Sequence, residues 1–117
     1  MEYISYEEFK KLDIRVGTIK TVEPVAETDK LLKCMVDAGD KTEDGETKLR
    51  QIVSGIREYY PDYEKLIGKQ VLYIVNLEPR MIKGIQSQGM LMAVDGKEVN
   101  PVFLIPEVEV PPGAKVR

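Results

Sequence analysis

The sequence predicts an all-β fold closed into a small barrel. Apolar side chains follow strand periodicity in five segments, and a helix is predicted between the third and fourth of them. The first strand, residues 13–23, is long and changes its apolar face after Gly17, as a bent barrel strand does. A short N-terminal helix precedes this set and a C-terminal extension follows it. This is the element order of the five-stranded OB-fold, a Greek-key barrel.

The N-terminal helix is predicted at about residues 6–12. Ser5 and Glu8 have the spacing of a capping box, in which the serine accepts from a free amide and the glutamate reaches back. So short a helix cannot bury all its apolar neighbours alone, and both core packing and a dimer contact are open for them. These neighbours are Tyr3, Ile4, Tyr6, Phe9 and Leu12.

Two strands and a hairpin loop follow the first strand. Alternating apolar and polar side chains predict strands at residues 30–38 and 48–55, joined by a charged loop at residues 39–47. In the later strand we expect Val53 on one face and Ile52 on the opposite, polar face. Cys34, the only cysteine, is expected to be a small buried hydrophobic residue.

The second half of the chain is predicted from proline and glycine signals and from further apolar runs. Prolines after residue 105 predict an irregular tail. A short helix is expected within residues 57–66, where Pro61 could begin it and Gly68 could end it. Strands are expected at residues 71–77, 90–94 and 102–105, and a turn is expected at Asp95-Gly96.

The composition argues against catalysis. The chain contains no histidine, the commonest general base and metal ligand. Its acidic residues form neither a metal-loop pattern nor a helical carboxylate pair. We therefore expect a non-catalytic protein with no metal and no cofactor. With 43% hydrophobic and 32% charged residues, it should fold as one globular domain over residues 1–117.

Charge and hydropathy indicate where the protein acts. No apolar run approaches the ~20 residues that span a bilayer, and the start is acidic rather than a basic leader, so we expect a cytoplasmic protein without membrane contact. The formal net charge of −3 argues against binding nucleic acid by bulk electrostatics. Residues 65–97 nevertheless carry five basic and two acidic side chains, which predicts a local basic surface.

The loop at residues 76–90 has the composition of a binding loop. Its proline ends the preceding strand, and its two glycines allow positive φ or close approach to a ligand. Arg80 and Lys83 can contact anionic oxygens, while Ser87 and Gln88 can donate and accept hydrogen bonds. These residues predict recognition of a phosphate-rich ligand.

The OB-fold places this loop beside a second candidate. In that fold the loops between strands one and two and between strands four and five flank the ligand site. The first loop here ends in Lys30, with Lys33 just inside the next strand. Composition and fold position therefore indicate the same face.

Several ordered motifs run through nearly the whole chain. They are Asp13-Ile14-Arg15-Val16-Gly17, Asp29-Lys30-Leu31, Ser54-Gly55-Ile56, Asn76-Leu77-Glu78-Pro79-Arg80, Gly84-Ile85-Gln86-Ser87-Gln88-Gly89-Met90 and Pro112-Gly113-Ala114-Lys115-Val116. Together they resemble the tRNA-binding domain found at the C-terminus of methionyl-tRNA synthetases, in endothelial-monocyte-activating polypeptide II and its synthetase-associated relatives, and as free-standing tRNA-binding proteins.

The resemblance implies an OB-fold protein that binds tRNA by shape and backbone, often as a homodimer, and raises a synthetase's affinity for tRNA without performing the chemistry. Because the chain starts at its own Met and holds no catalytic domain, it looks like a separate beta subunit of methionyl-tRNA synthetase, with the catalytic subunit as a partner, or like a free-standing relative. The residues implied are Lys30, Lys33, Arg80 and Lys83 at phosphates, Ser87 and Gln88 at sugar or base edges, and Met90 against an unstacked base.

A second function stays open, that of a chaperone or protein-interaction module on the same fold, as in the export-associated relatives. The acidic balance favours it, as does Val25-Ala26-Glu27-Thr28, which stands where many members have His-Pro-Asn-Ala and puts an acid in the first loop. Arg50 is set aside as an RNA contact because it can pair with neighbouring acids. Four tyrosines could stack on bases, the first three being expected to cover the barrel's end: Tyr59, Tyr60, Tyr63 and Tyr73.

Overall fold

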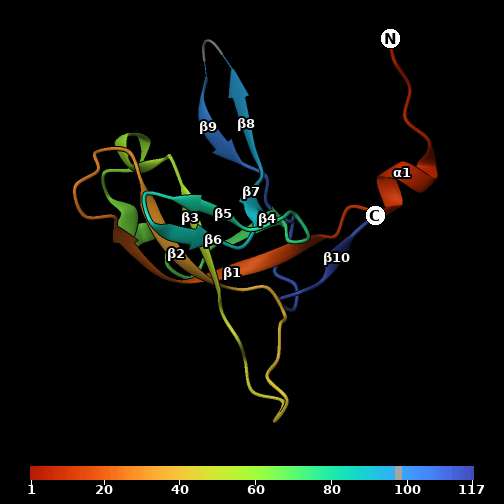
Figure 1. Ribbon diagram of the computed structural model, residues 1–117, viewed down its shortest axis with the longest axis horizontal. Helices are drawn as coiled ribbons and strands as arrows, with labels where there is room; N and C mark the ends of the chain where they lie inside the picture. The colour runs from red at the N-terminus through yellow and green to blue at the C-terminus, as the bar shows by residue number, and fades with distance from the viewer. Residues whose placement is uncertain (97–98) are drawn as a thin grey trace.

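The computed structural model describes residues 1–96 and 99–117 and shows a nearly closed barrel of five antiparallel strands (Figure 1). The predicted all-β, OB-like fold is confirmed. In sheet order the strands are β3 (Arg50–Ser54), β2 (Leu32–Asp37), β1 (Ile14–Pro24), β4 (Gln70–Ile74) and β7 (Met90–Leu91). Within the described part, no helix has the length and apolar character needed to cross a membrane.

β1 is the long strand at the centre of the sheet, where it pairs with both β2 and β4. The predicted irregularity is present, but the register shifts between Ile19 and Thr21 rather than at Gly17. Gly17 has a different role, because a Cβ there would lie 2.5 Å from Val36 Cγ1 and 2.9 Å from the Tyr73 ring. A glycine is therefore needed where core side chains pack directly onto the β1 backbone.

The barrel interior is filled by aliphatic side chains and one tyrosine. Ile52 is only 1% exposed, so its predicted place on a polar face is wrong. Val53, on the opposite face, is buried as well, and its backbone N–H donates to Ser87 Oγ at the outer edge of β3. The largest fully buried side chains are Tyr73, Ile19, Leu32, Ile52, Val36 and Val71.

Two buried side chains have protonation states set by burial. Cys34 is 3% exposed, as predicted, and burial raises the pKa of its thiol to about 11. Tyr73 is fully buried, and loss of solvent raises the pKa of its phenol. Base stacking by Tyr73, considered from the sequence, is therefore ruled out by its position in the core.

α1 (Tyr6–Lys10) is loosely attached to the barrel. It begins as predicted, with Ser5 Oγ accepting a hydrogen bond from Glu8 N at 3.1 Å, but it ends before the predicted limit at Leu12. In Figure 1 it lies near the C-terminus at one end of the molecule. None of its residues is buried, so apolar side chains remain exposed there.

The helix expected between β3 and β4 consists instead of two 3-10 turns, η1 (Arg57–Tyr59) and η2 (Tyr63–Leu66). Pro61 lies between them, and proline lacks an N–H and disfavours helical backbone in the residue before it. Tyr60 stacks on Phe103 with ring centroids 4.8 Å apart. Tyr60 and Tyr63 thus pack against the core, as expected, whereas Tyr59 is 41% exposed.

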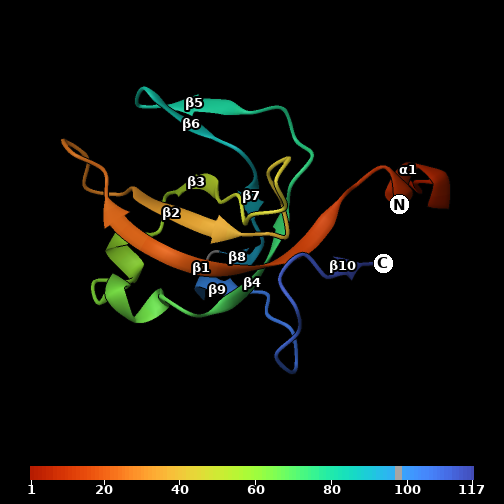
Figure 2. The ribbon, with the colours of Figure 1, turned by 90° about the horizontal axis from the view of Figure 1, so that it is seen from below.

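Two β-hairpins project from the barrel (Figures 1 and 2). The strand predicted at residues 90–94 is divided into β7 and β8, and the strand predicted at residues 102–105 starts earlier. Asp95 and Gly96, where the turn was predicted, are instead the last two residues of β8. The hairpins are β5 (Arg80–Ile82) with β6 (Ile85–Ser87), and β8 (Ala93–Gly96) with β9 (Val99–Phe103).

The C-terminal tail is more regular than its prolines predict. Its last strand, β10 (Lys115–Val116), pairs with the start of β1. Gly113 N donates to Val16 O at 2.8 Å. Gly39 and Gly113 lie so close that a Cβ on either would be 2.7 Å from the other's Cα. The glycine of the final motif therefore allows the tail to pack on the barrel.

Candidate nucleic-acid interface

The hairpin β5–β6 places Arg80 and Lys83 in solvent. Its two-residue turn, Lys83-Gly84, has φ values of 51° and 80°, the left-handed backbone that matches the twist of a tight hairpin. Arg80 pairs with Ser87 across the two strands. Arg80 and Lys83 are both exposed, and among the described residues neither forms an ion pair. Both cations are therefore available to an anionic ligand.

Ser87 and Gln88 attach this hairpin to β3. Ser87 Oγ accepts from Val53 N at 3.0 Å and donates to Gly89 O at 3.3 Å. Gln88 Oε1 accepts from Gln51 N at 3.0 Å, and Gln88 N donates to Gln51 O at 2.8 Å. Ser87 is 5% exposed, so the structure places it inside the protein rather than on the predicted contact surface. The two side chains complete the outer edge of β3.

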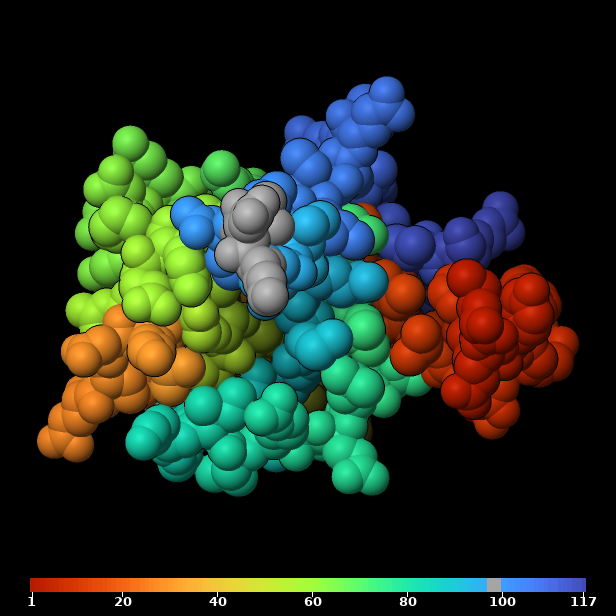
Figure 3. Space-filling model, turned by 90° about the horizontal axis from the view of Figure 1, so that it is seen from above, coloured from red at the N-terminus to blue at the C-terminus, as the bar shows by residue number. Residues whose placement is uncertain are grey.

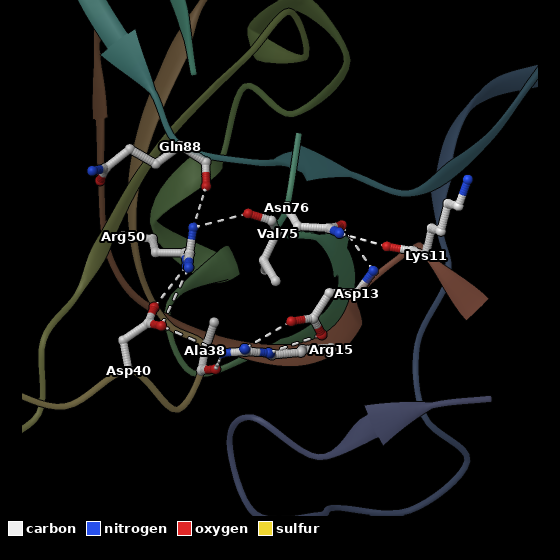
Figure 4. A network of polar contacts seen from close by, with 9 residues as sticks. All are labelled: Lys11, Asp13, Arg15, Ala38, Asp40, Arg50, Val75, Asn76 and Gln88. Atoms are coloured by element: carbon white, nitrogen blue, oxygen red, sulfur yellow. Dashed lines mark hydrogen bonds and ion pairs between the residues drawn. The ribbon is translucent and has the colours of Figure 1, made fainter. Parts of the chain in front are cut away.

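A second attachment runs through Arg50 (Figure 4). Its guanidinium donates to both carboxylate oxygens of Asp40, at 2.6 and 3.2 Å. It also donates to Val75 O at 3.1 Å and to Gln88 O at 2.9 Å. Arg50 thus ties β3 to both ends of the loop that carries the hairpin, which agrees with setting it aside as an RNA contact.

The first motif joins the same network (Figure 4). Arg15 donates to the two Asp13 oxygens at 3.1 and 2.8 Å, and to Asp40 Oδ1 at 3.3 Å. The Asn76 side chain accepts from Asp13 N at 2.8 Å and donates to Lys11 O at 2.6 Å. Residues from three of the motifs therefore hold the loop in its conformation, rather than contacting a ligand themselves.

The network makes the stability of the fold dependent on pH. The hydrogen bond from Arg15 lowers the pKa of the Asp13 carboxyl below its ordinary value. A lowered pKa in the folded state adds stability above the ordinary value of about 3.9, and that stability is lost as the pH falls through the folded value. We expect the Tm to fall below about pH 4, and to fall less steeply in Asp13→Asn. Calorimetric melting across that range checks this, and identical slopes would contradict it.

The loop before β2 carries the other candidate cations. Lys30 is exposed, whereas Lys33 Nζ lies 2.6 Å from Glu23 Oε1 and is paired within the protein. Glu27 is exposed in this loop, with φ of 62°. Figures 2 and 3 place this loop, coloured orange, near the tip of the β5–β6 hairpin. The two predicted loops therefore lie on one side of the barrel.

A groove separates the two hairpins, and the sequence analysis did not anticipate it. Its volume is about 670 Å³, and its lining includes Arg80 and Met90. Met90 is 47% exposed although it starts β7, so this strand methionine faces the groove rather than the core. The groove depends on the β8–β9 hairpin folding back beside β7, which local patterns do not reveal.

Comparisons with known proteins agree with this geometry. A family model described as a putative tRNA binding domain matches residues 14–115. The methionine–tRNA ligase of Thermococcus kodakarensis is 44% identical over 100% of this chain, and the chain spans 15% of that protein's length.

Two solved structures are similar over the whole chain. A MetRS-related protein from Pyrococcus horikoshii has a TM-score of 0.86 and 36% identity, with 100% of both chains covered. The chaperone CsaA from Bacillus anthracis has a TM-score of 0.81 and 28% identity, covering 99% of this chain and 100% of that one. The same barrel thus occurs in proteins named for two different roles.

Proposed function

This chain belongs to the family of putative tRNA-binding domains, and from that premise we propose that it binds tRNA without performing chemistry. Its contact surface, called here the tRNA surface, consists of Lys30, Arg80, Lys83 and Met90. Arg80, Lys83 and Lys30 neutralise phosphates, and Met90 packs against a base. Ser87 and Gln88 act indirectly, by holding the hairpin on β3. Lys33 contributes less, because Glu23 already neutralises it.

The observation that carries this proposal is the charged tip of the β5–β6 hairpin. Lys83 occupies a left-handed conformation, with φ of 51°, in which asparagine or glycine is preferred in such turns. A lysine in this conformation lowers the stability of the turn by about 1 kcal/mol, yet it places a positive charge at the end of the hairpin. Keeping a cation at a strained position of an acidic protein fits a role in binding anions.

We propose that the chain acts as the beta subunit, or accessory domain, of a cytoplasmic methionyl-tRNA synthetase and raises its affinity for tRNA. The 44% identity to a segment of a methionine–tRNA ligase supports this role. The catalytic subunit is then a partner, and this chain supplies tRNA contacts beyond the active site.

The test is tRNA binding by the purified protein across a salt series. We expect binding at micromolar concentration or tighter, with an affinity that falls steeply as salt rises, because phosphate contacts release counterions. Absence of binding at low salt contradicts the proposal.

We also propose a homodimer formed through α1 and the residues before it. Tyr3, Ile4 and Tyr6 are 86%, 70% and 67% exposed, an apolar group that a monomer leaves in water. Sedimentation at micromolar concentration is expected to give a dimer for the protein and a monomer for Ile4→Glu. Ile67→Glu, at an exposed apolar position in another part of the fold, should remain dimeric. A monomeric unmodified protein contradicts the dimer.

A second candidate function is that of a chaperone or protein-interaction module. The likeness to CsaA over 99% of the chain supports it, as does the groove with its methionine lining, since methionine adapts to varied apolar partners. Charge reversal at Arg80 and Lys83 separates the two functions. A tRNA-binding protein loses its ligand, whereas an apolar interaction module retains its protein partners.

A further inference from the structure

The groove between the hairpins is large enough to hold a small ligand group. Its volume of about 670 Å³ lies in the range of small-ligand sites. In Figure 3 the teal hairpin β5–β6 and the light blue strand β8 lie on either side of a recess, and the yellow-green end of β3 lies between them. The apolar lining includes Leu31, Ile82, Met90, Met92 and Leu104.

Gly55 marks the end of β3 in this groove. It belongs to the motif Ser54-Gly55-Ile56, which the contacts described above leave unexplained. Its backbone is not in the left-handed region, and a Cβ built on it would meet no atom within 4 Å. At Gly17, by contrast, a Cβ would lie 2.5 Å from Val36. The fold therefore does not require glycine at position 55, and the open space beside its backbone suits close approach of a ligand.

Of the residues that the structure describes, three with charged side chains line the same groove: Glu78, Arg80 and Asp95. Arg80 also belongs to the tRNA surface, so the groove is continuous with the phosphate contacts. A carboxylate only accepts hydrogen bonds, so it matches a ligand edge that carries an amino group. Cytosine, adenine and guanine present such groups, whereas the N3–H donor of uracil lies between two carbonyl oxygens that a carboxylate repels.

We propose that this groove takes one unpaired base of the bound RNA and prefers an amino-bearing base over uracil. The inference rests on the proposed tRNA function, because Arg80 holds the phosphate that brings the base to the groove. Met90 and Met92 cover the base faces, the Glu78 carboxylate accepts from the amino group, and the Gly55 backbone lies against the base edge. Unpaired bases are what RNA-binding proteins commonly read in this way.

The test compares two single-stranded probes of equal length, oligocytidylate and oligouridylate, by fluorescence anisotropy with the full chain. We expect at least about fivefold tighter binding of oligocytidylate, the discrimination of one specific base contact. Gly55→Leu fills the groove and should remove the preference without lowering the Tm, because the added side chain enters open space. In NMR spectra of the isotope-labelled protein, the Gly55 amide resonance should shift more when oligocytidylate is added than when oligouridylate is added.

The charge contact is tested separately, so the result does not depend on Gly55→Leu folding. Glu78→Gln should bring the ratio of the two affinities toward one, and Glu43→Gln, in the exposed loop between β2 and β3, should leave it unchanged. Equal affinities in the unmodified protein overturn the base site, while salt-dependent tRNA binding still supports the proposed function. Failure of every RNA to bind sinks both. If an apolar peptide shifts the Gly55 resonance and oligocytidylate does not, the groove binds peptides and the proposal is overturned.

Discussion

Reversing the charge of both Arg80 and Lys83 to glutamate is expected to lower the affinity for tRNA at least about a hundredfold at low salt. A charge-assisted contact to a phosphate is worth roughly 1.5–3 kcal/mol, so the two contacts proposed for these cations are together worth at least about 3 kcal/mol. The plot of log affinity against log salt should also become shallower by about one unit per lost phosphate contact. Anisotropy of labelled tRNA across the salt series measures both quantities.

Two variants separate the role of the hairpin from that of net charge. Lys69→Glu reverses one charge, half the change of the double variant, on the segment between η2 and β4, which lies across the barrel from the hairpin in Figure 2. It should weaken binding little. Lys83→Asn removes one charge while suiting the left-handed turn, so it should weaken binding with the Tm kept or raised. Full affinity in the double variant, or equal losses in Lys69→Glu, would contradict the tRNA surface.

The barrel could be predicted because its strands alternate or run apolar over local stretches. Leu32, Cys34 and Val36 show the period of two directly, and all three are buried. Ile52 and Val53 break this rule, because both are buried although they lie on opposite faces of β3. A strand covered on both faces loses the alternation on which its orientation was predicted.

The candidate site was predicted less completely, because its residues act through distant partners. Ser87 and Gln88 are recognisable as hydrogen-bonding residues, but their partners on β3 lie more than 30 positions away in the chain. Lys33 is paired with Glu23 only through the register of β1 and β2. Exposed cations at a hairpin tip, such as Lys83, need no distant partner, and composition alone identified them.

Loss of the Asp40 carboxylate is expected to lower the free energy of unfolding by about 2–4 kcal/mol. Asp40 is 21% exposed and bridges Arg15 and Arg50, themselves 22% and 23% exposed. Its removal leaves the Arg50 guanidinium without its carboxylate, while Arg15 keeps Asp13. Urea unfolding of Asp40→Ala measures the loss. Asp44→Ala, in the same loop but exposed, should change stability by less than about 0.5 kcal/mol.

The same variant should loosen the loop that carries the tRNA surface. Without Asp40, the Arg50 guanidinium loses the carboxylate that helps to orient it toward Val75 O and Gln88 O, the contacts that hold both ends of that loop. Hydrogen exchange should then accelerate at the Val53 amide, which donates to Ser87, more than at amides within the β1–β4 pair. The affinity for tRNA should fall although Arg80 and Lys83 are intact. Uniform acceleration with unchanged affinity would instead mean that the network stabilises the barrel as a whole and does not position the hairpin.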